Sequence, residues 1–113
     1  MPYSDAAARR LRVALAGHEG LTEKELFGGI AFLLHGNMAV GVHGDDLIVR
    51  VDPEQTDALL REPGARNFDL GPGGRPAKGW LLVSPAGFRS EATLQVWVRR
   101  GGRVMPPAFR ARP

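Results

Sequence analysis

The feature that constrains this chain most is a stretch, residues 22–51, in which short runs with a two-residue period alternate with glycine-containing turns. Because successive side chains of a strand point to opposite faces, a two-residue period predicts extended segments. The turns are short enough to join neighbouring antiparallel strands, so the stretch predicts a meander. The expected strands are Thr22–Phe27, Ile30–His35, Met38–His43 and Leu47–Val51.

The register of the last hairpin can be tested within the sequence. A two-residue loop at Gly44-Asp45 makes every residue on one face of this hairpin apolar. We therefore expect this face to pack in the core. The opposed pairs are Val42–Leu47, Val40–Val49 and Met38–Val51.

The preceding hairpin decides which other apolar residues share that face. A two-residue turn, at His35-Gly36 or at Gly36-Asn37, places Ala31 and Leu33 beside Met38, whereas a three-residue loop would exchange the two faces. With the two-residue turn the opposite face is apolar too, with Ile30, Phe32, Leu34, Ala39, Gly41 and Ile48. Monomers seldom expose an apolar patch of this size, so we expect a subunit interface. Its expected residues are Ile30, Phe32, Leu34 and Ile48.

Three helices and a fifth strand are expected around the meander. Ser4 or Asp5 can cap a helix that runs to about Ala16, and Asp52 can cap a short helix with Pro53 in its first turn. Ser90 can cap a last helix that ends at Gly101-Gly102. The fifth strand is Trp80–Val83, and residues 64–78 are expected to be a loop. The fold class is therefore α+β, with two layers, an antiparallel sheet of about five strands and three helices.

Length and charge set the domain organisation. The 113 residues fit one domain, which we place at residues 1–103. The net charge is +3, but residues 99–113 carry five arginines and no acid, which leaves the rest of the chain at −2. We therefore expect residues 104–113 to be a disordered basic tail.

Cysteine usage and hydropathy bound the location and the chemistry. The chain has no cysteine, which excludes disulfides, thiolate metal sites and a cysteine nucleophile. Neither a signal peptide nor an apolar run long enough for a membrane is visible, so we expect a cytoplasmic protein without membrane contact.

One glycine-rich string invites a cofactor hypothesis. Residues 69–74, Asp-Leu-Gly-Pro-Gly-Gly, resemble the nucleotide loop of an S-adenosylmethionine-dependent methyltransferase. No buried strand precedes this string and no helix follows it, so we interpret it as a surface loop and expect no cofactor. The histidines His18, His35 and His43 belong to separate segments, so we expect no metal site.

The remaining candidates for catalysis have simpler interpretations. Asp45 and Asp46 suit a hairpin turn, Ser90 suits a helix cap, and Ser84 lacks a partner base. We therefore expect no catalytic residue and no enzyme. For Trp80, core packing is favoured over stacking on a base. The residues that could contact an anion or a nucleic acid are Lys78, Trp80, Arg99, Arg100 and Arg103.

Several segments together carry a family resemblance. They are Thr22–Gly29 (TEKELFGG), Phe32-Leu33, Gly36–Met38, Gly44–Val51 (GDDLIVRV), Pro76–Trp80 (PAKGW) and Trp97. In combination they resemble the N-terminal domain of the TfoX/Sxy family, known for bacterial competence regulators, over about residues 5–101. The resemblance implies a two-layer α+β domain like the secretion-chaperone fold, whose sheets often pair into dimers, and it supplies no catalytic residue. It also implies a stand-alone member that lacks the C-terminal domain of the full regulators.

These observations lead to one expected function and two alternatives. We expect a non-enzymatic regulatory or protein-interaction module that forms a homodimer and binds a protein partner that the sequence does not identify. The first alternative is a nucleic-acid-binding regulator that uses the basic C-terminal segment. The second is a methyltransferase, for which the residues offer no support.

Overall fold

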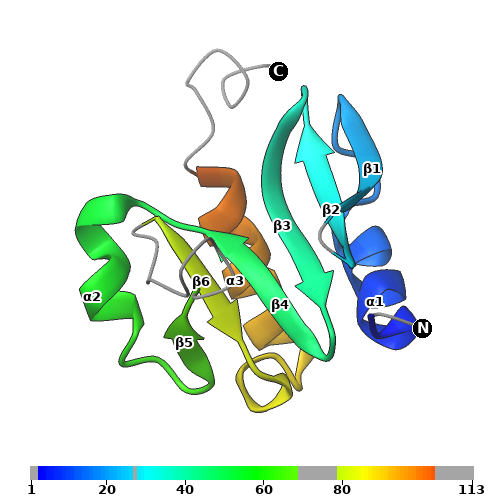
Figure 1. Cartoon of the computed structure of the whole chain (residues 1–113). Helices are drawn as coiled ribbons and strands as arrows, with labels where there is room; N and C mark the ends of the chain where they lie inside the picture. The colour runs from blue at the N-terminus through cyan, green and yellow to red at the C-terminus, as the bar shows by residue number, and fades with distance from the viewer. Residues whose placement is uncertain (1–2, 27, 69–78, 104–113) are drawn as a thin grey trace.

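In the computed structural model, which describes residues 3–26, 28–68 and 79–103, helices and strands form two layers (Figure 1). The helices are α1 (Asp5–Leu15), α2 (Thr56–Leu59) and α3 (Glu91–Arg103). The strands are β1 (Leu21–Leu26), β2 (Gly29–Leu34), β3 (Asn37–His43), β4 (Asp46–Arg50), β5 (Ala65–Asn67) and β6 (Trp80–Val83). This arrangement confirms the α+β class. The predicted glycine string and basic tail lie outside the described residues.

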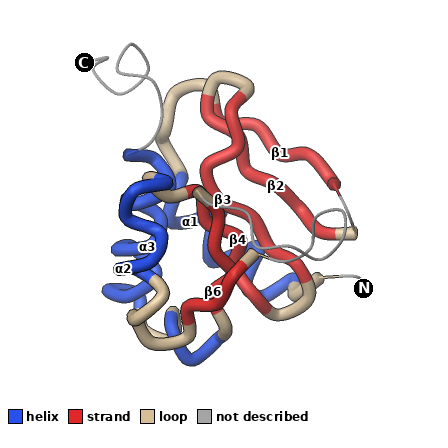
Figure 2. The backbone as a smooth tube through the Cα atoms, turned by 60° about the vertical axis from the view of Figure 1, so that its left-hand side comes forward, coloured by secondary structure: helices blue, strands red, loops and turns tan. Residues whose placement is uncertain are grey.

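The six strands form one antiparallel sheet in the order β1-β2-β3-β4-β6-β5. The meander β1 to β4 follows the chain as predicted, and β6 then pairs with β4. Strand β5 is an addition, because its three residues were expected to lie in a loop. Figure 2 shows the helices gathered on one side of this sheet.

Side-chain caps start the helices where the sequence predicts. The Ser4 hydroxyl accepts the Ala7 N–H at 3.1 Å, and an Asp52 carboxylate oxygen accepts the Glu54 N–H at 2.9 Å. Asp52 thus opens a short 3₁₀ turn, Pro53–Gln55, ahead of α2. The Ser90 hydroxyl accepts the Thr93 N–H at 3.1 Å and opens α3. Each bond satisfies an N–H that has no partner within its helix.

The buried Thr56 ties α2 to the start of β6. Its hydroxyl accepts the Gly79 N–H at 3.0 Å and donates to the Asp52 carbonyl at 3.2 Å. A single side chain therefore satisfies backbone groups on both sides of residues 69–78, which stand between α2 and β6 in the sequence.

The predicted end of α3 at Gly101-Gly102 is wrong, because the helix continues through both glycines to Arg103. At Gly101 the reason is a close approach to the sheet. A Cβ there would lie 2.5 Å from the Ala39 carbonyl oxygen and 2.8 Å from a Val40 methyl carbon. Gly101 therefore allows helix and sheet backbones to approach rather than ending the helix.

The β3–β4 hairpin has the predicted register. Val42 is opposite Leu47 and Val40 is opposite Val49, and Gly44 takes a positive φ of 58° at the turn. The turn between β2 and β3 also has two residues, His35 and Gly36, with φ of 51° and 83°. Two successive positive φ values match the right-handed twist of a hairpin.

The β2–β3 pairing nevertheless shifts by one residue beyond this turn. Leu33 is opposite Met38, but Phe32 is opposite Val40, so Ala39 is an extra residue in a β-bulge. Because of this extra residue, Ile30 and Phe32 share a face with Val42 and Val40. The prediction had placed Ala31 and Leu33 on that face. Met38 consequently leaves the core, where it was predicted to oppose Val51, and its methyl lies over Gly41 on the other face.

The bulge overturns most of the predicted interface assignment. Ile30 and Phe32 are 5% and 0% exposed and belong to the core beneath the helices, so neither has a surface to offer a second subunit. Leu34 points to the same face as Phe32 and packs with Ala39 and Leu21 in a small cluster of its own. Of the four predicted interface residues, only Ile48 lies on the face away from the helices, and at 6% exposed it too offers almost no surface.

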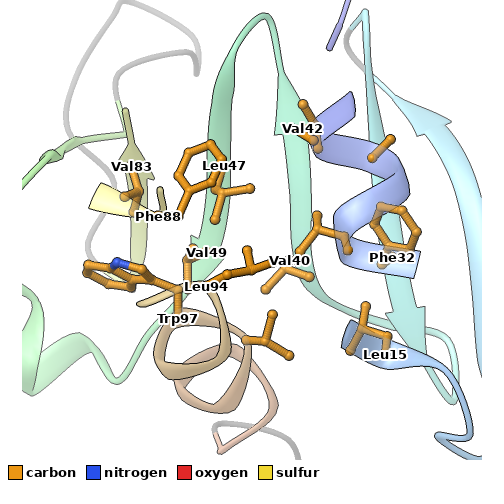
Figure 3. Packing of buried hydrophobic residues seen from close by; sticks show 14 of the residues in the cluster. Leu15, Phe32, Val40, Val42, Leu47, Val49, Val83, Phe88, Leu94 and Trp97 are labelled. Atoms are coloured by element: carbon orange, nitrogen blue, oxygen red, sulfur yellow. The ribbon is translucent and has the colours of Figure 1, made fainter. Parts of the chain in front are cut away.

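The core fills the space between the sheet and the helices (Figure 3). Leu15 of α1 contributes from one side, and Leu94 and Trp97 of α3 contribute from the other. The Trp97 indole N–H donates to the Gly87 carbonyl at 3.2 Å, which satisfies the polar atom of this buried ring. The strand residues of the core are Ile30, Phe32, Val40, Val42, Leu47, Val49, Leu81 and Val83.

Candidate interaction surface

The sheet face that points away from the core, here called the open face, is the principal candidate for function. No helix of the described residues lies over it (Figure 2). Its side chains alternate along each strand with those of the core. The residues that define it are Thr22, Lys24, Ala31, Leu33, Met38, Gly41, Asp46, Ile48, Arg50, Arg66, Trp80 and Leu82.

The centre of the open face is apolar. Ile48 and Leu82 are directly opposite each other in the β4–β6 ladder and are 6% and 3% exposed. Leu33 and Met38, which are opposite each other in the β2–β3 ladder, are half-buried. A partner on this face would therefore gain contacts mainly with the half-buried side chains around a centre that is already packed.

An arginine and two aromatic rings form one end of the open face. Arg50 is opposite Trp80 in the ladder, and its guanidinium carbon lies 5.8 Å from the centroid of the Trp80 ring. The Phe68 ring follows at 6.0 Å from Trp80, tilted by 42°. The expectation that Trp80 packs in the core is wrong, because the ring is half-buried and lies on the open face.

The two arginines of α3 lie in the other layer. Arg100 extends over the Trp97 ring at 4.6 Å from its centroid, and its Nη1 is 3.3 Å from a Glu62 carboxylate oxygen. Arg99 is exposed. Because the sheet separates these residues from Trp80, the structure does not bring the predicted nucleic-acid contacts onto one surface. Lys78 and the Arg103 side chain lie outside the described part of the chain.

Ion pairs of the described residues connect separate elements. Arg10 of α1 lies 3.2 Å from Glu91 at the start of α3 and also donates to the carbonyls of Arg89 and Ser90. Arg66 of β5 pairs with Asp46 of β4 across the open face. These pairs have a structural role that explains the residues without any catalytic chemistry.

The pair of Arg12 and Glu23 fastens α1 to the edge strand β1. The guanidinium donates to both carboxylate oxygens at 2.9 Å, and this hydrogen bonding lowers the pKa of Glu23 below its ordinary value of 4.5. A lowered pKa in the folded state means that the pair stabilises the protein above the ordinary pKa and loses this effect as the pH falls through the folded value.

We expect Glu23→Gln to reduce the free energy of unfolding by about 0.2–1 kcal/mol at pH 7, because the pair is largely exposed. The difference from the unchanged chain should shrink as the pH falls below 4.5, and urea melts at pH 7, 5 and 3 would measure it. A difference of the same size at all three pH values would contradict this assignment.

The described residues show neither a metal cluster nor a membrane-spanning helix. No group of three histidine, aspartate or glutamate side chains within 3–26, 28–68 and 79–103 could hold a metal ion. His18 instead has a ring nitrogen 3.0 Å from the Leu15 carbonyl oxygen. In the same ranges no helix is long and apolar enough to cross a bilayer.

A comparison of this chain with models of protein families gives a match over most of its length. The model of the TfoX N-terminal domain matches residues 14–104. The chain belongs to the TfoX N-terminal domain family. The match confirms the resemblance that the sequence segments carry. Neither a curated protein nor a solved structure matches the chain.

The matched span of this TfoX N-terminal domain contains the whole open face. Sequence reasoning placed Gly41 and Ile48 on this face and singled out Trp80 for a different reason. Arg50 and Trp80 meet because β6 returns to pair with β4, which are separated in the sequence by α2 and β5. A pairing between strands so far apart cannot be predicted from a local sequence pattern. The sequence does show that an arginine and a tryptophan lie within predicted strands, where such side chains can pair across a ladder.

Proposed function

We propose that this TfoX N-terminal domain is a non-enzymatic interaction module with a regulatory role, and that it works as a homodimer. The observation that supports the proposal is the open face itself. Within the described residues the helices lie on one side of the sheet, while apolar and aromatic side chains remain half-buried on the other. The part of these side chains that is still accessible to water would be buried by a partner, and burial of apolar area favours association.

The composition of the open face fits an interface. It offers Met38, Leu33 and Trp80 as large adaptable contacts, with the Arg66–Asp46 pair at its margin. Interfaces are enriched in methionine, aromatic residues and arginine and combine an apolar centre with a polar rim. In the helix layer, by contrast, Arg10 and Arg100 form ion pairs with Glu91 and Glu62 that hold elements together.

The experiment is static light scattering across a concentration series, with one substitution on the open face. We expect the unchanged chain to be a dimer at micromolar concentration. Met38→Asp should raise the dimer dissociation constant at least tenfold, because a charge would have to lose its water on association. Circular dichroism should show that the variant stays folded.

The matched control is Val13→Asp, which places the same charge on α1. Val13 is 75% exposed and lies on the helix side, so this variant should dimerise like the unchanged chain. A monomeric unchanged chain at high concentration would overturn the proposed homodimer. Equal weakening by both substitutions would show that the open face is not the contact.

A further inference from the structure

Arg50, Trp80 and Phe68 form a row across three neighbouring strands at one end of the open face, here called the arginine–aromatic row. Arg50 is the last residue of β4, Trp80 is the first residue of β6, and Phe68 directly follows β5 (Figure 1). All three side chains are half-buried, so each still has surface in contact with water. The row therefore offers one cation and two rings to a ligand.

The backbone beneath the row is held in place by hydrogen bonds. The Val51 N–H donates to the Gly79 carbonyl at 2.8 Å, and the Gly79 N–H donates to the Thr56 hydroxyl at 3.0 Å. These bonds fix the residues that come directly after Arg50 and directly before Trp80. A site on strands fixed in this way needs little reorganisation when a ligand binds.

Arg50 differs from the other half-buried arginines because it has no acid partner among the described residues. Arg10 pairs with Glu91 and Arg100 pairs with Glu62, whereas in residues 3–26, 28–68 and 79–103 no carboxylate pairs with Arg50. Charges interact more strongly where water is partly excluded than where they are fully solvated. A half-buried guanidinium without an anion is therefore a favourable place for one to bind.

The acids closest to Arg50 along the chain have other partners. Asp46, on the same face of β4, pairs with Arg66. Asp52 follows Arg50 by two residues, but one of its carboxylate oxygens accepts the Glu54 N–H at 2.9 Å. Strands β5 and β6 contain no acid. An anion for Arg50 has to come from outside the described residues.

The packing of the row indicates which kind of anion fits. The Arg50 guanidinium lies over the Trp80 ring, so a nucleobase could stack on that face only by displacing it. Nucleic acids also bind through several phosphates, whereas the row has a single cation. A guanidinium that stacks on a ring has its plane fixed, and its fork of N–H donors matches one carboxylate.

We propose that the arginine–aromatic row binds an acidic segment of a partner protein. One aspartate or glutamate side chain of that segment pairs with the Arg50 guanidinium, and a neighbouring apolar side chain packs against Trp80 and Phe68. The inference rests on the proposed interaction module and adds the chemistry of the partner, but it does not depend on the homodimer. The ion pair supplies specificity, and burial of the remaining exposed ring area supplies affinity.

The two tryptophans of the chain provide a reporter and an internal control. Trp80 lies in the row, whereas the Trp97 indole N–H is buried and bonded to the Gly87 carbonyl. We would titrate ¹⁵N-labelled protein with the capped peptide acetyl-Ala-Leu-Glu-Leu-Ala-amide and follow both indole N–H signals by NMR, with Trp80→Phe to assign them. We expect only the Trp80 signal to move. The peptide with glutamine in place of glutamate should bind at least about tenfold more weakly.

Three variants test the role of the guanidinium. Arg50→Met should bind the glutamate peptide as weakly as the glutamine peptide, because the ion pair is lost. Arg50→Lys retains the charge but loses the fork, and it should weaken binding by at least about threefold. Arg99→Met is the matched control, since it removes an exposed arginine of α3, and it should bind like the unchanged chain. An unchanged Trp97 signal shows that the core of each variant is folded.

Several results would overturn the inference. They are a Trp80 signal that the glutamate peptide leaves in place, equal affinity for the two peptides, and an Arg50→Met or Arg50→Lys variant that binds like the unchanged chain. A Trp80 signal that moves with a thymidine oligonucleotide and not with the peptide would assign the row to nucleic acid instead. Light scattering tests the homodimer separately, so a monomeric chain that binds the glutamate peptide would refute the homodimer alone.

Discussion

Replacing Phe32 with aspartate should abolish folding, whereas the same change at the adjacent Leu33 should leave the fold intact. Phe32 is 0% exposed and lies in the core between the sheet and the helices (Figure 3). Loss of a buried phenylalanine side chain alone costs about 3–5 kcal/mol. A buried unpaired carboxylate adds several kcal/mol, and the total stability of a small domain is only about 5–15 kcal/mol.

Leu33, the next residue in β2, points to the opposite face of the sheet. Its side chain is half-buried on the open face, so an aspartate there can reach water. Far-ultraviolet circular dichroism and urea melts would compare the two variants with the unchanged chain. A folded Phe32→Asp variant, or an unfolded Leu33→Asp variant, would show that the β-bulge at Ala39 is placed wrongly.

Alanine substitutions at the two adjacent glycines of α3 should change stability in opposite directions. Alanine is the better helix former by about 0.8–1 kcal/mol, so an unconstrained glycine in a helix is a site for stabilisation. At Gly102 nothing lies within 4 Å of an added Cβ. Gly102→Ala should therefore raise the free energy of unfolding by about 0.5–1 kcal/mol.

At Gly101 the added carbon would lie 2.5 Å from the Ala39 carbonyl oxygen, which is backbone and moves only with β3. Overpacking of this kind costs about 1–3 kcal/mol, so Gly101→Ala should destabilise the protein despite its better helix propensity. Chemical denaturation of both variants gives the two signs. Stabilisation at both positions would mean that α3 packs further from the sheet than the structure shows.

The local features that could be predicted are those with a local cause. Ser4, Asp52 and Ser90 cap helices because their side chains reach N–H groups two or three residues further along. The Gly44-Asp45 hairpin could be predicted from its turn residues. Its register could be predicted because it makes every residue on one face of the hairpin apolar. The predicted helix end at Gly101-Gly102 was wrong for a non-local reason. Glycine also occurs where two backbones approach closely, and Gly101 lies against the backbone of β3.

The candidate surface was harder to predict. Ile48 was placed correctly because the β3–β4 hairpin is regular, but Ile30, Phe32 and Leu34 were assigned across a bulge. A bulge inserts one residue into a period of two and thereby exchanges the faces of everything beyond it. Gly41, two residues after Ala39, is the one local hint, since a glycine within a strand often accompanies a bulge, but it does not say where the extra residue lies.

The sequence by itself determined the class of fold, the order of the meander strands, the helix starts and the membership of the TfoX N-terminal domain family. Only the tertiary structure decided which side of β2 faces the helices and which residues meet across β4 and β6. Periodicity records that side chains alternate, but the direction of the alternation depends on which face the helices cover, and that is settled by packing between segments far apart in the chain.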